Sequence, residues 1–206
     1  MQQALVTMLT MQDAMNTRVH PDWYRQDFAW YRALWVECAE LLDHYGYKWW
    51  KAQNTDMPQV QMEVVDIWHF GLSALLVEER DIPALAARLD AQIRSHHIEQ
   101  ADVRLATEAL ARETLISRTF PVAAFLDVMH AVELTPEALY CAYVGKNVLN
   151  FFRQDNGYKE GTYRKEWRGR EDNEHLQELL ALLDNTRTTF PDDLYAALAQ
   201  RYRDAA

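Results

Sequence analysis

The chain has 206 residues and a formal charge of −10, with 49% hydrophobic and 25% charged residues. This balance is typical of one compact domain and excludes a disordered or fibrous chain. The acidic total argues against a protein that wraps duplex DNA, because phosphate binding needs a broad basic face.

Apolar residues recur at helical spacing along nearly the whole chain, and strand-like alternation is almost missing, which predicts an all-α fold in a single domain over residues 1–206. Two helix starts have clear signals, Thr135-Pro136-Glu137 and Phe190-Pro191-Asp192. Between the last helices, residues 154–174 predict a long polar loop, and such loops in compact domains are often functional. The expected helices cover residues 2–16, 29–51, 57–80, 82–94, 98–116, 121–132, 136–153, 173–184 and 191–203.

The first stretch, MQQALVTMLTMQDAMNTR, lacks the positive region and uninterrupted apolar run of a secretory signal. No later run approaches the ~18 apolar residues that a membrane span needs. Cys38 and Cys141 lie far apart in helical contexts, which favours two core residues over a disulfide or a metal pair. We therefore expect a cytoplasmic protein with neither a membrane nor a nucleic acid as partner.

The second and third expected helices each carry two carboxylates one turn apart. Glu37 and Glu40 form E-x-x-E and, after a gap of 22 residues, Glu63 and Asp66 form E-x-x-D. Residues three apart project from one helix face, so antiparallel packing would bring four carboxylates together. Buried carboxylates need counter-charges, and an all-oxygen ligand set favours Mg²⁺ or Mn²⁺ over zinc. The sequence thus predicts a helical bundle with a four-carboxylate metal site between antiparallel helices.

Two other interpretations of these carboxylates stay open. Either pair alone is typical of a solvated helix stripe, although apolar neighbours such as Leu34 and Val64 argue against it. A di-iron bundle takes Glu-x-x-His from each of two helices. Here His69 completes only one D-x-x-H, with Asp66, and the first pair has no matching histidine.

A basic segment follows near the end of the seventh expected helix. Lys146, Asn150 and Arg153 are spaced i, i+4 and i+7, which places them along one face. Residues 145–170 contain seven basic and three acidic residues, a local net charge of +4. Arginine and lysine beside a glycine-containing loop suit a polyphosphate, and the alternative is a solvated charged loop.

Aromatic residues flank the carboxylates. Lys48-Trp49-Trp50-Lys51 lies between the two pairs, and Phe70 follows Asp66 by four residues. Such rings near a metal and phosphate site can stack a nucleotide base, although the helices also need aromatic packing residues.

With E-x-x-E, KWWK, EVVDIWHF and YVGKNVLNFFRQDNGYKEGTY in view, the sequence resembles the dimeric, all-α dUTP diphosphatase family. The resemblance implies a homodimer of all-α subunits, with Mg²⁺ (two or more ions, Mn²⁺ as a substitute) bound by Glu37, Glu40, Glu63 and Asp66. It further implies uracil recognition by Gln12 and Asn16, with Trp49 and His69 at other base-pocket positions and Phe70 stacking on the base. The matching phosphate-binding residues are Lys146, Asn150, Arg153, Tyr158 and Lys159.

The expected activity is therefore hydrolysis of dUTP, and of dUDP, to dUMP, with pyrophosphate released from dUTP. Metal-bridged phosphate oxygens and an activated water fit this chemistry, but the sequence does not identify the general base, for which Glu40 is a weak choice. Two alternatives stay open. One is a related pyrophosphatase that prefers dCTP or a modified nucleotide, and the other is a helical nucleotide-binding module without turnover.

Overall fold

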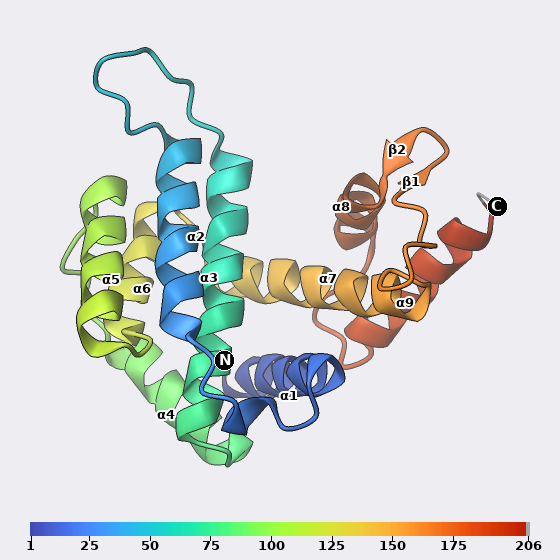
Figure 1. Cartoon of the computed structure of the whole chain (residues 1–206), viewed down its shortest axis with the longest axis horizontal. Helices are drawn as coiled ribbons and strands as arrows, with labels where there is room; N and C mark the ends of the chain where they lie inside the picture. Colours follow the sequence, from blue (N-terminus) through green and yellow to red (C-terminus); the bar gives the residue numbers. More distant parts are fainter. Residues whose placement is uncertain (205–206) are drawn as a thin grey trace. The chain divides into compact units, whose positions relative to one another are not determined.

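The computed structural model describes residues 1–204, and their contacts divide the chain into two compact units (Figure 1). Unit 1 is Met1–Leu139, and unit 2 begins at Tyr140. The expected all-α fold is confirmed, since helices account for most of the described residues. The expectation of one domain over residues 1–206 stays a prediction.

Unit 1 is a bundle of six helices and one 3₁₀ turn. Helix α2 packs along α3 and against α5, while α1 packs on α4 and α3, and α5 on α6. In Figure 1 the chain runs along α2, turns through a projecting loop and returns along α3, so the two helices are antiparallel. The bounds are α1 Gln2–Val19, η1 Trp23–Arg25, α2 Trp30–Tyr45, α3 Met57–Glu78, α4 Ile82–Ser95, α5 Val103–Ser117 and α6 Val122–Ala131.

Helix α3 lies at the centre of unit 1. Asp56 caps its start by accepting a hydrogen bond from the backbone N–H of Gln59 at 3.3 Å. Trp68 is buried and stacks on Phe125, with ring centroids 5.0 Å apart. The helix is long and apolar enough to cross a membrane, but 72% of its most apolar window is buried within the protein. That burial is typical of the core helix of a globular bundle.

The end of α2 differs from the expected helix over residues 29–51, which is wrong from residue 46 onward. Gly46 adopts a φ of +95°, a conformation that side chains disfavour, and so it ends the helix after Tyr45. Its carbonyl oxygen accepts hydrogen bonds from the guanidinium of Arg104, which also lies 4.8 Å from the Tyr45 ring. Helix α5 likewise begins at Val103 instead of residue 98, because Asp102 caps it.

Unit 2 contains most of α7 (Pro136–Asp155), then β1 (Glu166–Trp167), β2 (Arg170–Glu171), α8 (Asp172–Leu182) and α9 (Phe190–Arg203). Its core is aromatic. Phe152 contacts Trp167 and Tyr202, and Trp167 stacks on His175 with ring centroids 5.0 Å apart.

Residues 154–174 are not the continuous loop that the sequence predicts. They contain the antiparallel pair β1–β2, in which Trp167 pairs with Arg170. Arg168 and Gly169 form the two-residue turn with φ of 52° and 77°, the backbone that tight hairpins require. Glu171 then starts α8 through a capping box with Glu174.

Candidate functional site

Three of the four predicted metal ligands meet where α2 packs on α3. Glu37, Glu63 and Asp66 each offer a ligand atom, and these atoms lie within 4.8 Å of one another. Glu63 is buried, and the other two are half-buried. The i, i+3 spacing on α3 and the antiparallel pairing with α2 thus place the carboxylates as the sequence predicts.

The electrostatics of this group favour a bound cation. The pKa of Glu37 is raised to about 8, first by burial and then by the negative charges of Asp66, Glu40 and Glu63. His44 Nε2 lies 3.4 Å from Glu63 Oε1. Oxygen ligands around concentrated negative charge fit a hard divalent ion such as Mg²⁺.

Glu40 stands apart from the other three. It is exposed, and it does not belong to the group whose ligand atoms lie within 4.8 Å of one another. Its charge nevertheless contributes to the raised pKa of Glu37, so it lies within electrostatic range. The geometry therefore gives a tight group of three carboxylates with a fourth at its edge.

The predicted base-reading residues form a hydrogen-bonded network between α1 and α3. Gln12 Nε2 donates to Asn16 Oδ1 at 3.1 Å, and His69 Nδ1 lies 2.9 Å from Gln12 Oε1. Both amides also donate to Ser73 Oγ, from Gln12 Nε2 at 3.0 Å and from Asn16 Nδ2 at 2.9 Å. The structure thus brings Gln12, Asn16 and His69 together.

Ser73 is a member of this network that sequence reasoning missed. It is fully buried, and its hydroxyl donates to the backbone oxygen of His69 at 3.0 Å. Its position, one turn after His69 in an apolar helix, is a weak signal that a buried serine must find polar partners.

Phe70, the predicted stacking ring, is half-buried and lies beside Trp30, with ring centroids 6.3 Å apart and planes tilted by 35°. Trp30 in turn contacts Trp23 and Phe28 edge-on. Trp30 was not among the predicted site residues, because an aromatic residue at the start of an apolar helix is typical of packing.

Trp49 is not brought to this network. It lies in the loop between α2 and α3, which projects from unit 1 in Figure 1, and the residue is 91% exposed. Its ring contact is with the neighbouring Trp50, at 5.5 Å between centroids.

In unit 2, the predicted phosphate-binding residues follow one face of α7 and the turn after it. Arg153 makes a two-pronged ion pair with the fully buried carboxylate of Asp172, at 2.8 Å from Nε and 2.9 Å from Nη2. Tyr163 also donates to Asp172 Oδ2, at 2.8 Å. Asn150 Oδ1 lies 3.5 Å from Arg153 Nη1. Lys146 is half-buried, and Tyr158 and Lys159 are exposed.

These contacts shift the pKa values of the cluster. Burial alone would raise the pKa of Asp172, but hydrogen bonds from Arg153 and Tyr163 hold it below its usual range. Burial opposes the charge on Arg153, yet the partnership with Asp172 raises its pKa. Asp172 was not a predicted residue, since nothing in its spacing from Arg153 indicates that they meet.

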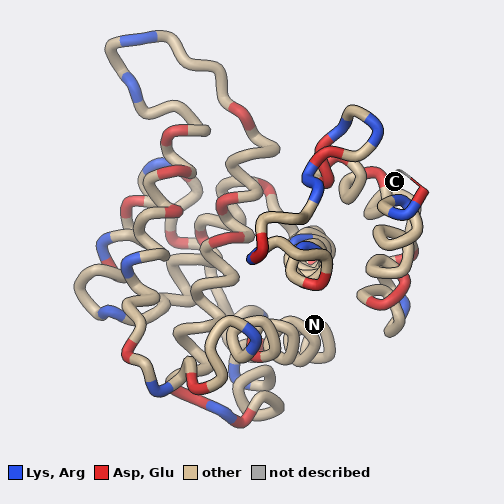
Figure 2. The backbone as a smooth tube through the Cα atoms, turned by 45° about the vertical axis from the view of Figure 1, so that its right-hand side comes forward, with Lys and Arg blue, Asp and Glu red and all other residues tan. Residues whose placement is uncertain are grey.

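The positive charge counted in residues 145–170 is largely paired within unit 2. Figure 2 shows basic and acidic residues side by side around the β1–β2 hairpin. Lys165 pairs with Glu171 at 3.1 Å, Arg170 pairs with Glu178, and Arg168 donates to the backbone oxygen of Asp204. The hairpin is therefore a mixed-charge surface.

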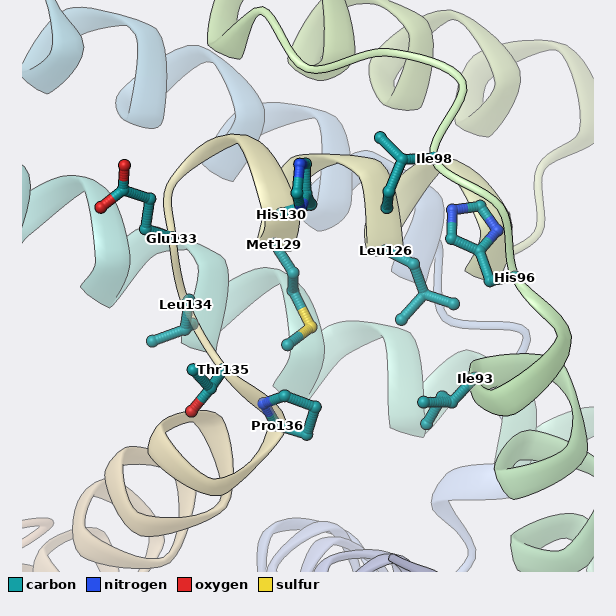
Figure 3. Close-up of a pocket in the computed structure, with 10 residues that line it drawn as sticks. All are labelled: Ile93, His96, Ile98, Leu126, Met129, His130, Glu133, Leu134, Thr135 and Pro136. Carbon is teal, nitrogen blue, oxygen red and sulfur yellow. The ribbon is translucent and has the colours of Figure 1, made fainter.

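A separate cavity of about 440 Å³ lies in unit 1, bounded by the end of α4, by α6 and by the start of α7 (Figure 3). Ile98, Leu126 and Met129 make it mostly apolar, and His96 at its edge pairs with Asp127 at 2.7 Å. Its lining includes none of the predicted site residues.

Comparison with models of protein families finds a match to the dUTPase family over residues 4–158. The matched region contains the carboxylate group, the amide network, α7 with Arg153, and Tyr158 in the turn that follows α7. A search of curated protein sequences finds no match.

Proposed function

Because the chain belongs to the dUTPase family and is therefore a dUTP diphosphatase, we propose that it hydrolyses dUTP to dUMP and pyrophosphate with Mg²⁺ held by α2 and α3. The observation that carries the proposal is the group of Glu37, Glu63 and Asp66, whose ligand atoms lie within 4.8 Å of one another. When bound, Mg²⁺ neutralises these carboxylates, polarises phosphate oxygens and makes a coordinated water more acidic.

The chain's own residues supply the rest of the reaction. Glu37, Glu63 and Asp66 would hold the metal, and Glu40 at the edge of the group would join them as the fourth ligand. Gln12 and Asn16 read the uracil edge, and Phe70 stacks on the ring. Lys146, Asn150, Arg153, Tyr158 and Lys159 bind phosphate oxygens, while His69, which contacts Gln12, lies beside the base.

The first test is pyrophosphate release from dUTP with and without Mg²⁺, in wild type and in Glu63→Gln. We expect turnover that needs the metal and that Glu63→Gln abolishes. Glu108→Gln is a matched control, because Glu108 is an exposed acid on α5 outside the carboxylate group. Near-normal activity of Glu63→Gln would contradict the metal site, and dUTP binding without turnover by wild type would favour the non-catalytic module.

Base choice needs a second test, because a relative that prefers dCTP or a modified nucleotide would share the same carboxylates. Initial rates on dUTP, dUDP, dCTP, dTTP and UTP separate these functions. We expect dUTP and dUDP to be preferred. The homodimer that the resemblance implies and the cytoplasmic location that the sequence pattern predicts both stay predictions. Light scattering of the purified protein tests the homodimer.

A further inference from the structure

Ser73 occupies the centre of the amide network, and its three hydrogen-bonding positions are all used. Its hydroxyl hydrogen goes to the backbone oxygen of His69, and its oxygen accepts from Gln12 Nε2 and Asn16 Nδ2. A hydroxyl has one hydrogen and two lone pairs. Since the hydrogen is committed along the helix, Ser73 Oγ can only accept from the two amides.

This restriction fixes the orientation of both amides. A side-chain amide has a donor end and an acceptor end, and rotation by 180° exchanges them. If either amide rotated, its oxygen would face Ser73 Oγ with no hydrogen between the two atoms. Gln12 in its present orientation also donates to Asn16 Oδ1 and directs Oε1 at His69 Nδ1, so the contacts agree with one another.

The orientation matters because uracil and cytosine also differ by an exchange of hydrogen-bond donors and acceptors. Uracil presents a carbonyl at C4 and an N–H at N3, while cytosine presents an amino group at C4 and a lone pair at N3. An amide that fits one base therefore opposes the other, unless it rotates. After its bonds to Ser73 and Gln12, Asn16 retains one N–H and one lone pair for such a ligand.

We propose that Ser73 is the positioning residue for base choice, because it holds the Gln12 and Asn16 amides in the orientation that accepts uracil and refuses cytosine. This inference rests on the proposed function, in which these amides read the base. Ser73 acts through them and touches no reacting atom.

The test compares kcat/KM for dUTP and dCTP in wild type, Ser73→Ala, Ser73→Cys and Ser73→Thr. Cysteine is close to serine in volume, so Ser73→Cys should keep the fold. Its sulfur is only a weak acceptor, so the Gln12 and Asn16 amides would no longer be held in one orientation. We expect the dUTP to dCTP ratio to fall about tenfold or more in the alanine and cysteine variants, because a mismatched buried polar group is what rejects a wrong ligand. Threonine keeps the hydroxyl and should restore most of the ratio.

Thr107→Val is the matched control. Thr107 is also fully buried in unit 1, and its hydroxyl donates to the carbonyl four residues earlier, at 2.7 Å from Val103 O, just as Ser73 does. This variant should lower the melting temperature and leave the ratio unchanged. A wild-type ratio in both Ser73→Ala and Ser73→Cys, or an equal loss in Thr107→Val, overturns the inference while the proposed function stands. Absence of a dUTP preference in wild type overturns both.

Discussion

The ion pair between Arg153 and Asp172 makes a quantitative prediction for Asp172→Asn. The carboxylate is fully buried and accepts two hydrogen bonds from Arg153 and one from Tyr163, whereas an asparagine turns an N–H₂ toward one of these donors. Removing one partner of a buried pair costs about 3–5 kcal/mol. Because 18% of the Arg153 side chain is exposed and water can partly solvate it, we expect a loss near the lower end, about 3 kcal/mol.

The assay is urea and thermal unfolding at pH 7, with Asp192→Asn, an exposed acid on α9, as control. For a chain of this size 1 kcal/mol shifts the melting temperature by about 2–4 °C, so the expected drop is roughly 6–12 °C. The lowered pKa of Asp172 fixes the sign of the pH dependence. Its stabilisation is present above the unfolded pKa of ~3.9 and is lost as the pH falls through the lower folded value. The difference in free energy of unfolding between wild type and Asp172→Asn should thus be constant above about pH 5 and decrease only at lower pH. A loss below about 1 kcal/mol at pH 7 would refute the reasoning.

Three further predictions test other parts of the chain. Glu37→Gln should raise the metal-free melting temperature at pH 9 and change it little below pH 4.5. The reason is that the folded pKa of Glu37, about 8, exceeds the unfolded value, so the ionised carboxylate destabilises the fold as the pH rises. Equal changes in melting temperature at both pH values would contradict this. Gly71→Ala should destabilise the protein by about 1–3 kcal/mol, although alanine has the better helix propensity, because the added Cβ would lie 2.7 Å from the buried Phe120 ring. A higher melting temperature of the variant would show that the Phe120 ring moves to make room. Arg153→Ala should weaken dUTP more than dUMP in calorimetry, and equal losses would assign Arg153 a purely structural role.

The sequence predicted the helices well because their apolar spacing is regular, and it placed Glu37, Glu63 and Asp66 because carboxylates in apolar helices are unusual. It was wrong about residues 46–51, where the φ of Gly46 ends α2 although apolar residues continue. It also missed the β1–β2 hairpin, whose turn depends on two residues with positive φ. The spacing of apolar residues does not predict the end of α2 or the hairpin, since each depends on one or two residues that adopt a positive φ.

The missed site residues have a different cause. Ser73 bonds side chains 57 and 61 residues away in the chain, and Asp172 bonds Arg153, 19 residues away. The spacing of residues along a single helix does not reveal such partners. The contact between Trp30 on α2 and Phe70 on α3 is likewise invisible to spacing along one helix. The functional roles of all the predicted site residues, Glu40 and Trp49 included, stay predictions.

Helix α3 carries both Asp66, a candidate metal ligand, and His69 and Ser73, which belong to the amide network. Each residue added to an α-helix rotates everything beyond it by about 100° and advances it by about 1.5 Å. A one-residue insertion between Asp66 and His69 would therefore turn the network away from α1 while leaving the carboxylates in register with α2. A change of length in this stretch of α3 would therefore separate the amide network from the carboxylate group.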